Sequence, residues 1–393
     1  MYTHLPLPPT DEIVPLMIRA SQDPRSEKVD MTVGVYRDDT GNTPIMEAAR
    51  KADQYLSVHR TSKAYVGSFG DAEFVNHIAD LSQVNRCGKF VKGIQTPGGS
   101  SALSLILNLI KAAQPDMKVW VSTPGYANHA PTILSVGLKL GEYPFLNRKT
   151  MGIETEPFLE TLSRLGPSDA VLFHGSCHNP SGLQLSEQMW HEIADLSKQK
   201  GFYPIIDTAY QGLGQGLDAD AKGLVIMAET VDNLAFSFSC SKNFGLYNDR
   251  VGCAFIMSSD SREAEYGQIQ LAAMARPAHW VPPQNGSEIV KQVLSTPALK
   301  KIWAKELNEM KERINNLRKA LAEALRIKTD TGKFDYLSDN KGLFSLLPAT
   351  PGHMEILRKK YAVYGLDDGR INIAGLGFNK VEHTADSIAA VIN

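Results

Sequence analysis

Residues 234–257 read LAFSFSCSKNFGLYNDRVGCAFIM, in which two apolar runs enclose a polar segment that carries Lys242 and Arg250. Short apolar runs bounded by polar residues and glycine are typical of buried strands. We therefore expect strands from Leu234 to Ser239 and from Val251 to Met257. Lys242 would then follow the carboxyl end of a buried strand, among small hydroxyl residues.

The chain on the N-terminal side of this segment alternates apolar runs with helical patterns from about residue 90. Three more strands are expected at Val119 to Ser122, Ala170 to His174 and Tyr203 to Asp207. Such alternation predicts a mainly parallel α/β sheet. Ligands bind beyond the carboxyl ends of the strands in open sheets of this kind. Asn179, Asp207 and Lys242 would meet there.

The chain on the C-terminal side contains a long amphipathic pattern, because apolar residues recur every three or four positions from Trp303 to Leu325. A chain of 393 residues with 43% apolar side chains is long for a single core. We expect the helix to connect two domains. The predicted organisation is an N-terminal arm with part of a small domain (1–43), a large domain (44–308) and the rest of the small domain (309–393).

Composition limits the class of partner. The 41 basic and 43 acidic residues leave a net charge of -2, which favours neither nucleic acid nor an anionic membrane. The four cysteines are too few for a disulfide framework, and the N-terminus lacks a basic segment followed by an apolar one. No apolar run approaches the roughly 20 residues that cross a bilayer. We expect a reduced, cytoplasmic protein that binds small molecules.

Two local patterns are compatible with a phosphate-bearing cofactor. A lysine with a lowered pKa can bond covalently to a carbonyl carbon, and an arginine beside hydroxyl groups can bind phosphate. Gly98 and Gly99 precede Ser100 and the apolar helix expected from Ala102 to Ile110, and a helix N-terminus favours an anion. By themselves these patterns also fit a surface lysine and a plain loop with an N-cap.

The whole run from Ser239 to Gly252 resembles the cofactor-lysine motif of the fold-type I pyridoxal-phosphate (PLP) enzymes, specifically the aspartate and aromatic amino-acid aminotransferases of subgroup I. The resemblance covers nearly the entire chain. Its other motifs are, in order, Val33-Gly34-Val35-Tyr36, Gln95-Thr96-Pro97-Gly98-Gly99-Ser100, Cys177-His178-Asn179-Pro180-Ser181-Gly182, Asp207-Thr208-Ala209-Tyr210-Gln211-Gly212 and Gly369-Arg370-Ile371-Asn372-Ile373-Ala374-Gly375.

The resemblance implies a large PLP-binding domain, whose mainly parallel, seven-stranded sheet is flanked by helices, and a smaller α/β domain built from both chain ends. It implies transfer of an amino group from an L-amino acid to a 2-oxo acid such as 2-oxoglutarate, with ping-pong kinetics. Another PLP reaction on the same fold (β-decarboxylation, β-elimination or oxidation) and a non-catalytic PLP-binding regulator are the alternatives.

The resemblance also assigns cofactor contacts. Lys242 would carry PLP and move the substrate Cα proton, Asp207 would pair with the pyridine nitrogen, and Tyr210 with Asn179 would hydrogen-bond the 3-oxygen. Without the resemblance, Asp207 would be read as an N-cap or turn residue. The phosphate ligands would be Gly99, Ser100, Ser239, Ser241, Arg250 and, from the neighbouring subunit of a homodimer, Tyr65.

For the substrate, the resemblance implies that Arg370 binds the α-carboxylate with Gly34 and Asn179, that Phe344 lines the site, and that Arg276 of the partner meets a distal carboxylate. Two positions depart from the family. Tyr126 stands where a tryptophan usually stacks on the cofactor, and Trp280 stands where relatives have small polar residues. These departures predict a pocket that also takes aromatic substrates.

Two other patterns suggest sites that we do not expect. Gly212, Gly214 and Gly216 miss the dinucleotide-binding spacing, and no apolar helix pattern follows them at once, so NAD is not expected. His174, Cys177 and His178 are too few and too poorly supported for a zinc site. No metal is expected. We expect His174 to support Asp207, with help from His129.

Overall fold

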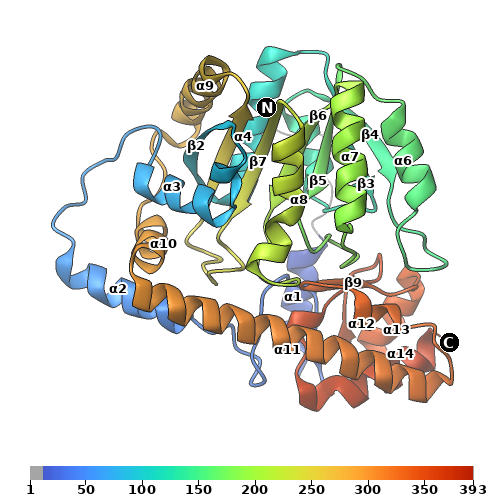
Figure 1. The fold of residues 1–393 in the computed structure, drawn as a ribbon. Coiled ribbons are helices and arrows are strands. Elements are labelled where there is room, and N and C mark those ends of the chain that lie inside the picture. The colour runs from blue at the N-terminus through green and yellow to red at the C-terminus, as the bar shows by residue number, and fades with distance from the viewer. Residues whose placement is uncertain (1–11, 393) are drawn as a thin grey trace, which may run out of the picture.

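The computed structural model describes residues 12–392 and contains a central seven-stranded sheet (Figure 1). The strand order is β2-β8-β7-β6-β5-β3-β4. β8 is antiparallel to both of its neighbours, and the remaining pairs are parallel. The strands are β2 (Phe90–Pro97), β3 (Lys118–Thr123), β4 (Lys139–Pro144), β5 (Asp169–His174), β6 (Tyr203–Thr208), β7 (Asn233–Ser239) and β8 (Val251–Ser258).

The five strands expected from the sequence are confirmed, and each observed end lies within one residue of its expected place. Their apolar side chains are buried on both faces of the sheet, as a parallel sheet covered by helices requires. The mainly parallel α/β architecture is confirmed with them.

Helices cover both faces of the sheet and divide its contacts into two apolar cores. α4 (Gly98–Ala113) and α9 (Ser261–His279) pack together on one face, and α7 (Glu187–Lys200) packs beside α8 (Leu217–Thr230) on the other. The other helices of the large unit are α2 (Glu47–His59), α3 (Ala72–Leu81), α5 (His129–Ser135), α6 (Thr155–Ser163) and α10 (Asn285–Ser295).

The long amphipathic helix is confirmed as α11 (Pro297–Thr329), whose 33 residues extend beyond the expected range at both ends. Its buried positions include Trp303, Leu307, Ile314 and Leu321. One half of α11 contacts α2 and α10, and the other half contacts α12 (Tyr336–Asp339) and α14 (Val381–Val391). α11 therefore runs beneath the large sheet unit into a smaller unit, as Figure 1 shows.

The smaller unit is built from both ends of the chain. β1 (Val29–Asp30) pairs in parallel with β10 (Val363–Tyr364), and β9 (Phe344–Leu346) pairs antiparallel with β11 (Arg370–Asn372). α1 (Ile13–Gln22) contacts β1, and α13 (Pro351–Tyr361) packs on α14 and β10. Segments from opposite ends of the sequence are thus brought close to the sheet unit.

Within residues 12–392, no helix has the length and apolar character needed to cross a membrane. The expectation about the N-terminal leader falls almost entirely on residues 1–11, which lie outside the described part of the chain.

Candidate active site

A cavity of about 360 Å³ lies beyond the carboxyl ends of the central strands and reaches the smaller unit. It gathers residues from every motif of the sequence. The expected site residues that line it are Gly34, Gly99, Ser100, Tyr126, Asn179, Asp207, Tyr210, Ser239, Ser241, Lys242, Arg250, Phe344 and Arg370. Tyr65 and Arg276 do not line the cavity of their own chain.

Lys242 lies in the turn after β7 and lines this cavity, so the interpretation as an ordinary surface lysine is wrong. Burial lowers its pKa to about 8, although the Asp207 carboxylate opposes the shift, and the nearby Arg250 guanidinium adds to it. Its Nζ lies 5.8 Å from the centre of the Tyr210 ring. An appreciable fraction of Lys242 is therefore a neutral, nucleophilic amine near neutral pH.

This pKa predicts a pH profile for cofactor-free protein. Only the neutral amine reacts with an acylating reagent, so the labelling rate of Lys242 should level off above pH 8, whereas an unperturbed lysine would continue to rise to about pH 10.4. Peptide mass spectrometry gives the rate at each lysine. Lys291 is the internal control, because partial burial is outweighed by its ion pair with Asp71 and its pKa is raised. Coincident profiles for the two lysines would contradict the prediction.

Asp207 is held by side chains and is not an N-cap. Its Oδ1 accepts a hydrogen bond from Ser237 Oγ (2.7 Å), and its Oδ2 lies 3.1 Å from His129 Nε2. Burial would raise the pKa of Asp207, but the hydrogen bond and the charge of His129 outweigh it and keep the pKa below its ordinary value. Asp207 thus offers an ionised carboxylate to the cavity.

The support of Asp207 differs from the expectation in one respect. His129 bonds the carboxylate directly, whereas His174 packs on His129 with ring centroids 4.9 Å apart and has no hydrogen bond to Asp207. Burial lowers the pKa of His174 to about 3, so this ring is neutral. His129 therefore makes the direct contact with Asp207, and His174 packs behind it.

The other residues of the suspected metal pattern have different partners. His178 lies 2.9 Å from Ser122 Oγ and 2.8 Å from Ser181 Oγ through its two ring nitrogens. Cys177 is buried, and burial raises the pKa of its thiol. Across residues 12–392, no group of three or more His, Cys, Asp or Glu side chains is arranged to hold a metal ion.

One end of the cavity is an anion cradle at the N-terminus of α4. This helix begins at Gly98, four positions earlier than expected, so both glycines belong to its first turn. A Cβ at Gly98 would lie 2.6 Å from Arg250 Nη2, and one at Gly99 would lie 2.9 Å from Ser239 Cβ. Arg250 also donates to Ser241 Oγ (3.3 Å). Helix dipole, guanidinium and hydroxyl groups therefore converge on one spot.

The middle of the cavity is lined by two phenols. Asn179 Nδ2 donates to the Tyr210 hydroxyl (3.3 Å), while the buried Oδ1 of Asn179 has no partner among the described residues. The Tyr126 ring lies edge-on to His129, with centroids 5.2 Å apart. Burial raises the pKa of Tyr210 and of Tyr126, so both phenols stay protonated and can donate hydrogen bonds.

The opposite end of the cavity presents Arg370. Its Nη2 donates to Thr32 O (2.9 Å), its guanidinium lies 4.7 Å from the centre of the Phe344 ring, and its buried Nε has no partner among residues 12–392. A Cβ at Gly34 would lie 2.4 Å from Phe344 Cζ, so only glycine fits beneath this ring. The unused donor makes Arg370 suited to a carboxylate.

Several functional positions were missed from the sequence. Ser237 bonds Asp207, and the Tyr247 hydroxyl accepts from Tyr36 N (2.9 Å) and so ties the lysine segment to the segment around Gly34. Asn372 Nδ2 donates to Val33 O and Val35 O at 2.7 Å each. Tyr247 and Asn372 lie inside recognised motifs, which was the available signal. Ile13, Leu103 and Asn128 also line the cavity and gave no such signal.

Tyr65 and Arg276 are both exposed. Trp280 is half exposed and its ring lies 4.9 Å from that of Tyr65. These three residues lie outside the cavity of their own chain, so contact with such a cavity requires a second copy of the protein.

The glycine pattern at Gly212, Gly214 and Gly216 serves a buried carboxylate. Asp220 accepts hydrogen bonds from the main-chain N–H groups of Gly212, Gly214 and Gln215 at 2.8–2.9 Å. A helix does follow at once, since α8 begins at Leu217, but its first turn carries Asp218 and Asp220 in place of an apolar pattern. The loop donors point at Asp220, and a pyrophosphate would need those same donors.

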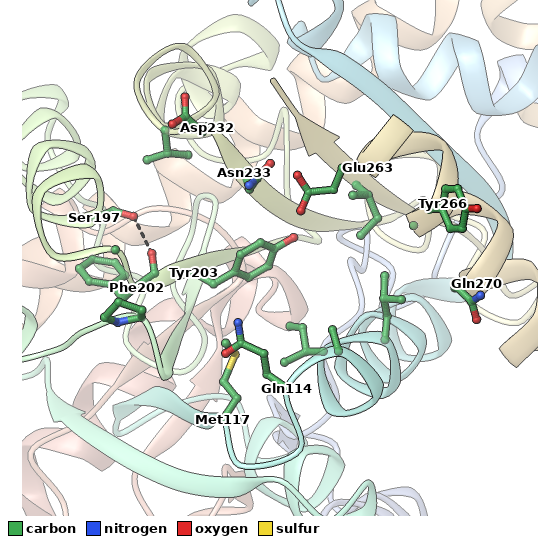
Figure 2. A pocket seen from close by; sticks show the side chains of 18 of the residues that line it. Gln114, Met117, Ser197, Phe202, Tyr203, Asp232, Asn233, Glu263, Tyr266 and Gln270 are labelled. Atoms are coloured by element: carbon green, nitrogen blue, oxygen red, sulfur yellow. Dashed lines mark hydrogen bonds between the residues drawn. The ribbon is translucent and has the colours of Figure 1, made fainter. Parts of the chain in front are cut away.

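A second cavity, of about 540 Å³, lies at the other edge of the sheet, where β6 and β7 begin (Figure 2). The side chains of Asn233 and Glu263 lie next to each other in this view, and the Tyr203 ring lies below them. Its charged lining residues are Lys198, Asp232 and Glu263, and none of the sequence motifs described above contributes a residue to it. The cavity around Lys242 is therefore the candidate active site.

Known proteins resemble the whole chain. The family described as "Aminotransferase class I and II" matches residues 26–388. The aromatic-amino-acid aminotransferase of Paracoccus denitrificans is 37% identical over 97% of both chains, and the aspartate aminotransferase of Escherichia coli K12 is 34% identical over 100% of both. The crystal structure of the Burkholderia pseudomallei aromatic-amino-acid aminotransferase covalently bound to pyridoxal phosphate superposes with a TM-score of 0.96, at 30% identity and full coverage of both chains. The chain therefore belongs to the class I and II aminotransferases.

Proposed function

We propose that this aminotransferase moves an amino group from aspartate or glutamate, and also from aromatic amino acids, to a 2-oxo acid such as 2-oxoglutarate. The observation that carries the proposal is the placement of Lys242. Its amine, with a pKa of about 8, lies in one cavity between the anion cradle at α4 and the Arg370 guanidinium. A phosphate-bearing cofactor and an α-carboxylate would occupy the two ends.

Pyridoxal phosphate is the cofactor, and the cavity fits it. The first turn of α4, Ser239, Ser241 and Arg250 would hold the phosphate, since the glycines there let the guanidinium and the strand end approach the helix. The unpartnered Oδ1 of Asn179 shows that the cavity has unused polar capacity. When bound, PLP supplies an aldehyde that takes the substrate amine and a ring that accepts electrons from the substrate Cα.

The residues of the chain supply positioning and proton transfer. We assign Lys242 as the group that binds PLP at rest and then, as a neutral amine, takes the proton from the substrate Cα. Asp207, kept ionised by its hydrogen bonds with His129 and Ser237, would accept a hydrogen bond from the ring nitrogen of the cofactor. Tyr210 and Asn179 would donate hydrogen bonds to the ring 3-oxygen, since burial keeps the Tyr210 phenol protonated.

The substrate is oriented by its carboxylates. Arg370 binds the α-carboxylate with help from Asn179 and the main chain at Gly34. The Phe344 ring packs against both the Arg370 guanidinium and Gly34. Tyr126, which lines the cavity, would flank the cofactor with a ring smaller than that of tryptophan. Arg276 of a second subunit reads a distal carboxylate, and Trp280 beside it widens specificity towards aromatic side chains.

We further propose that the enzyme is a homodimer with composite sites, that Tyr65 of each subunit reaches the cofactor phosphate of the other, and that it is cytoplasmic. Support for the dimer comes from the exposure of Tyr65, Arg276 and Trp280. Support for a reducing location comes from the four cysteines, which are all free. The domain division is proposed at residues 43 and 308, inside the connection to α2 and inside α11.

The specificity proposal predicts that Arg276→Ala affects substrate classes unequally. Deleting one partner of a desolvated charge pair costs about 2–5 kcal/mol. Activity with aspartate or 2-oxoglutarate should therefore fall by roughly 30-fold to several thousand-fold. Phenylalanine and tyrosine should lose far less, because they have no distal carboxylate.

The measurement is a single-turnover screen of the common amino acids, in which the absorbance change of the cofactor reports conversion to its amine form. Arg262→Ala, an exposed arginine on the same helix, is the matched control and should leave all rates unchanged. Equal losses for both classes, or none, would show that Arg276 does not read the distal carboxylate. Absence of conversion with any amino acid would contradict the proposed function.

A further inference from the structure

Two exposed aromatic rings that are far apart in the sequence are in contact: Tyr65, in the loop between α2 and α3, and Trp280, directly after α9. Tyr65 is 75% exposed and Trp280 is 49% exposed, and their ring centroids lie 4.9 Å apart with planes tilted by 45°. Tilted aromatic rings at this separation attract each other more strongly than the burial of their apolar area alone would account for. Residues 12–392 provide no hydrogen bond to the Tyr65 hydroxyl, so the Trp280 ring is the described contact that orients it.

One buried residue, Gln95, connects the chain that follows Tyr65 with the chain that follows Trp280. Its Oε1 accepts from Asp71 N (3.0 Å), and its main-chain N–H donates to Phe69 O (2.9 Å). Its Nε2 donates to Pro283 O (2.8 Å) and to Ser287 Oγ (2.9 Å). Gln95 therefore holds the chain just after Tyr65 (Phe69 and Asp71) and the chain just after Trp280 (Pro283 and Ser287) in a fixed relative position.

Trp280 adopts a backbone conformation that residues with side chains rarely take. It follows α9 with φ 60° and ψ -71°, and its N–H donates to Arg276 O (3.0 Å). Glycine takes such angles freely, whereas a bulky residue is strained there. Strained backbone persists where the surrounding structure supports it and is often found at functional sites, and the ring contact that the indole makes is with Tyr65.

We infer that Trp280 is a positioning residue that braces Tyr65 against the cofactor phosphate of the neighbouring subunit. The inference rests on the proposed composite dimer. Arg276, one helical turn before Trp280, is the residue assigned to the distal carboxylate of the same neighbouring site. Trp280 therefore couples the two contributions of one subunit, cofactor retention through Tyr65 and substrate reading through Arg276.

The test measures how fast pyridoxal phosphate leaves the holoenzyme, by trapping the released cofactor and following its absorbance. Trp280→Gly removes the ring and relieves the backbone, so it should fold normally and release PLP about 2- to 10-fold faster, the range expected for one aromatic contact. Trp280→Phe keeps a ring and should restore most of the wild-type rate. Tyr266→Ala, an exposed aromatic of α9, should leave the rate unchanged.

A double-mutant cycle separates bracing from other effects. In a Tyr65→Ala background there is no ring to brace, so Trp280→Gly should change the release rate by less than about 2-fold. The inference would be overturned if Trp280→Gly released PLP at the wild-type rate, or if the two substitutions were fully additive. It would also be overturned if sedimentation showed that the Trp280→Gly variant dissociates into single subunits. If Tyr65→Phe alone leaves the release rate unchanged, the composite site fails instead, because Tyr65 then does not reach the phosphate.

Discussion

Replacing Lys242 with alanine should abolish transamination, lowering turnover by about 10³-fold or more, while the protein still folds and binds PLP. We assign to this side chain both the bond to the cofactor at rest and the removal of the Cα proton, so one substitution would remove both roles. Retention of PLP is expected because the anion cradle at α4, Arg250 and Asp207 remain.

The measurement pairs cofactor absorbance, which reports binding, with single-turnover conversion by glutamate, which reports chemistry. Lys305→Ala on the exposed face of α11 is the control and should match the wild type in both. Near-normal conversion in Lys242→Ala would remove Lys242 from the chemistry. Loss of PLP binding together with unfolding would instead assign it a structural role.

Asp207→Ala should slow proton transfer from the substrate by on the order of 10³-fold and weaken PLP binding. The substitution removes the carboxylate that we propose keeps the ring nitrogen protonated, and without it the ring would accept electrons poorly. Because Asp207 bonds His129 and Ser237, the variant also leaves two buried polar groups without a partner. Some loss of stability, about 1–3 kcal/mol, should accompany the loss of activity.

The control for Asp207 is a carboxylate at the other end of the same sheet. Asp169 accepts hydrogen bonds from Trp120 Nε1 (2.7 Å) and from Gly166 N (3.0 Å). Asp169→Ala should therefore lower the melting temperature about as much as Asp207→Ala does. Its single-turnover rate should stay unchanged, because it is remote from the cavity. An Asp207→Ala variant that behaves like Asp169→Ala would show that Asp207 is only structural.

Much of the fold was predictable because its signals are local. The strands Tyr203–Thr208, Asn233–Ser239 and Val251–Ser258 each appear as an apolar run that ends in polar residues, and the pattern from Trp303 to Leu325 is a helical repeat. The start of α4 was misplaced because glycine lowers helix propensity. Here the backbone at Gly98 must approach the Arg250 guanidinium, and that contact outweighs the local preference.

The site divides in the same way. Asn179, Asp207 and Lys242 could be predicted to meet once the sheet was expected to be parallel, whereas Arg250 and Arg370 were placed at the same site only by the family resemblance. Ser237 gave no signal, because whether it faces Asp207 depends on the pairing of β7 with β6.

The sequence by itself predicted a mainly parallel α/β sheet with a lysine after a central strand, because apolar periodicity is a property of neighbouring residues, and the order of its motifs indicated the aminotransferase family by resemblance. Only the tertiary structure decided that His129, rather than His174, bonds Asp207, that Phe344 leaves room for no side chain at Gly34, and that Tyr65 meets Trp280. Each of these contacts joins elements that are distant in the chain, and their distances follow from strand order and helix packing, which no local pattern encodes.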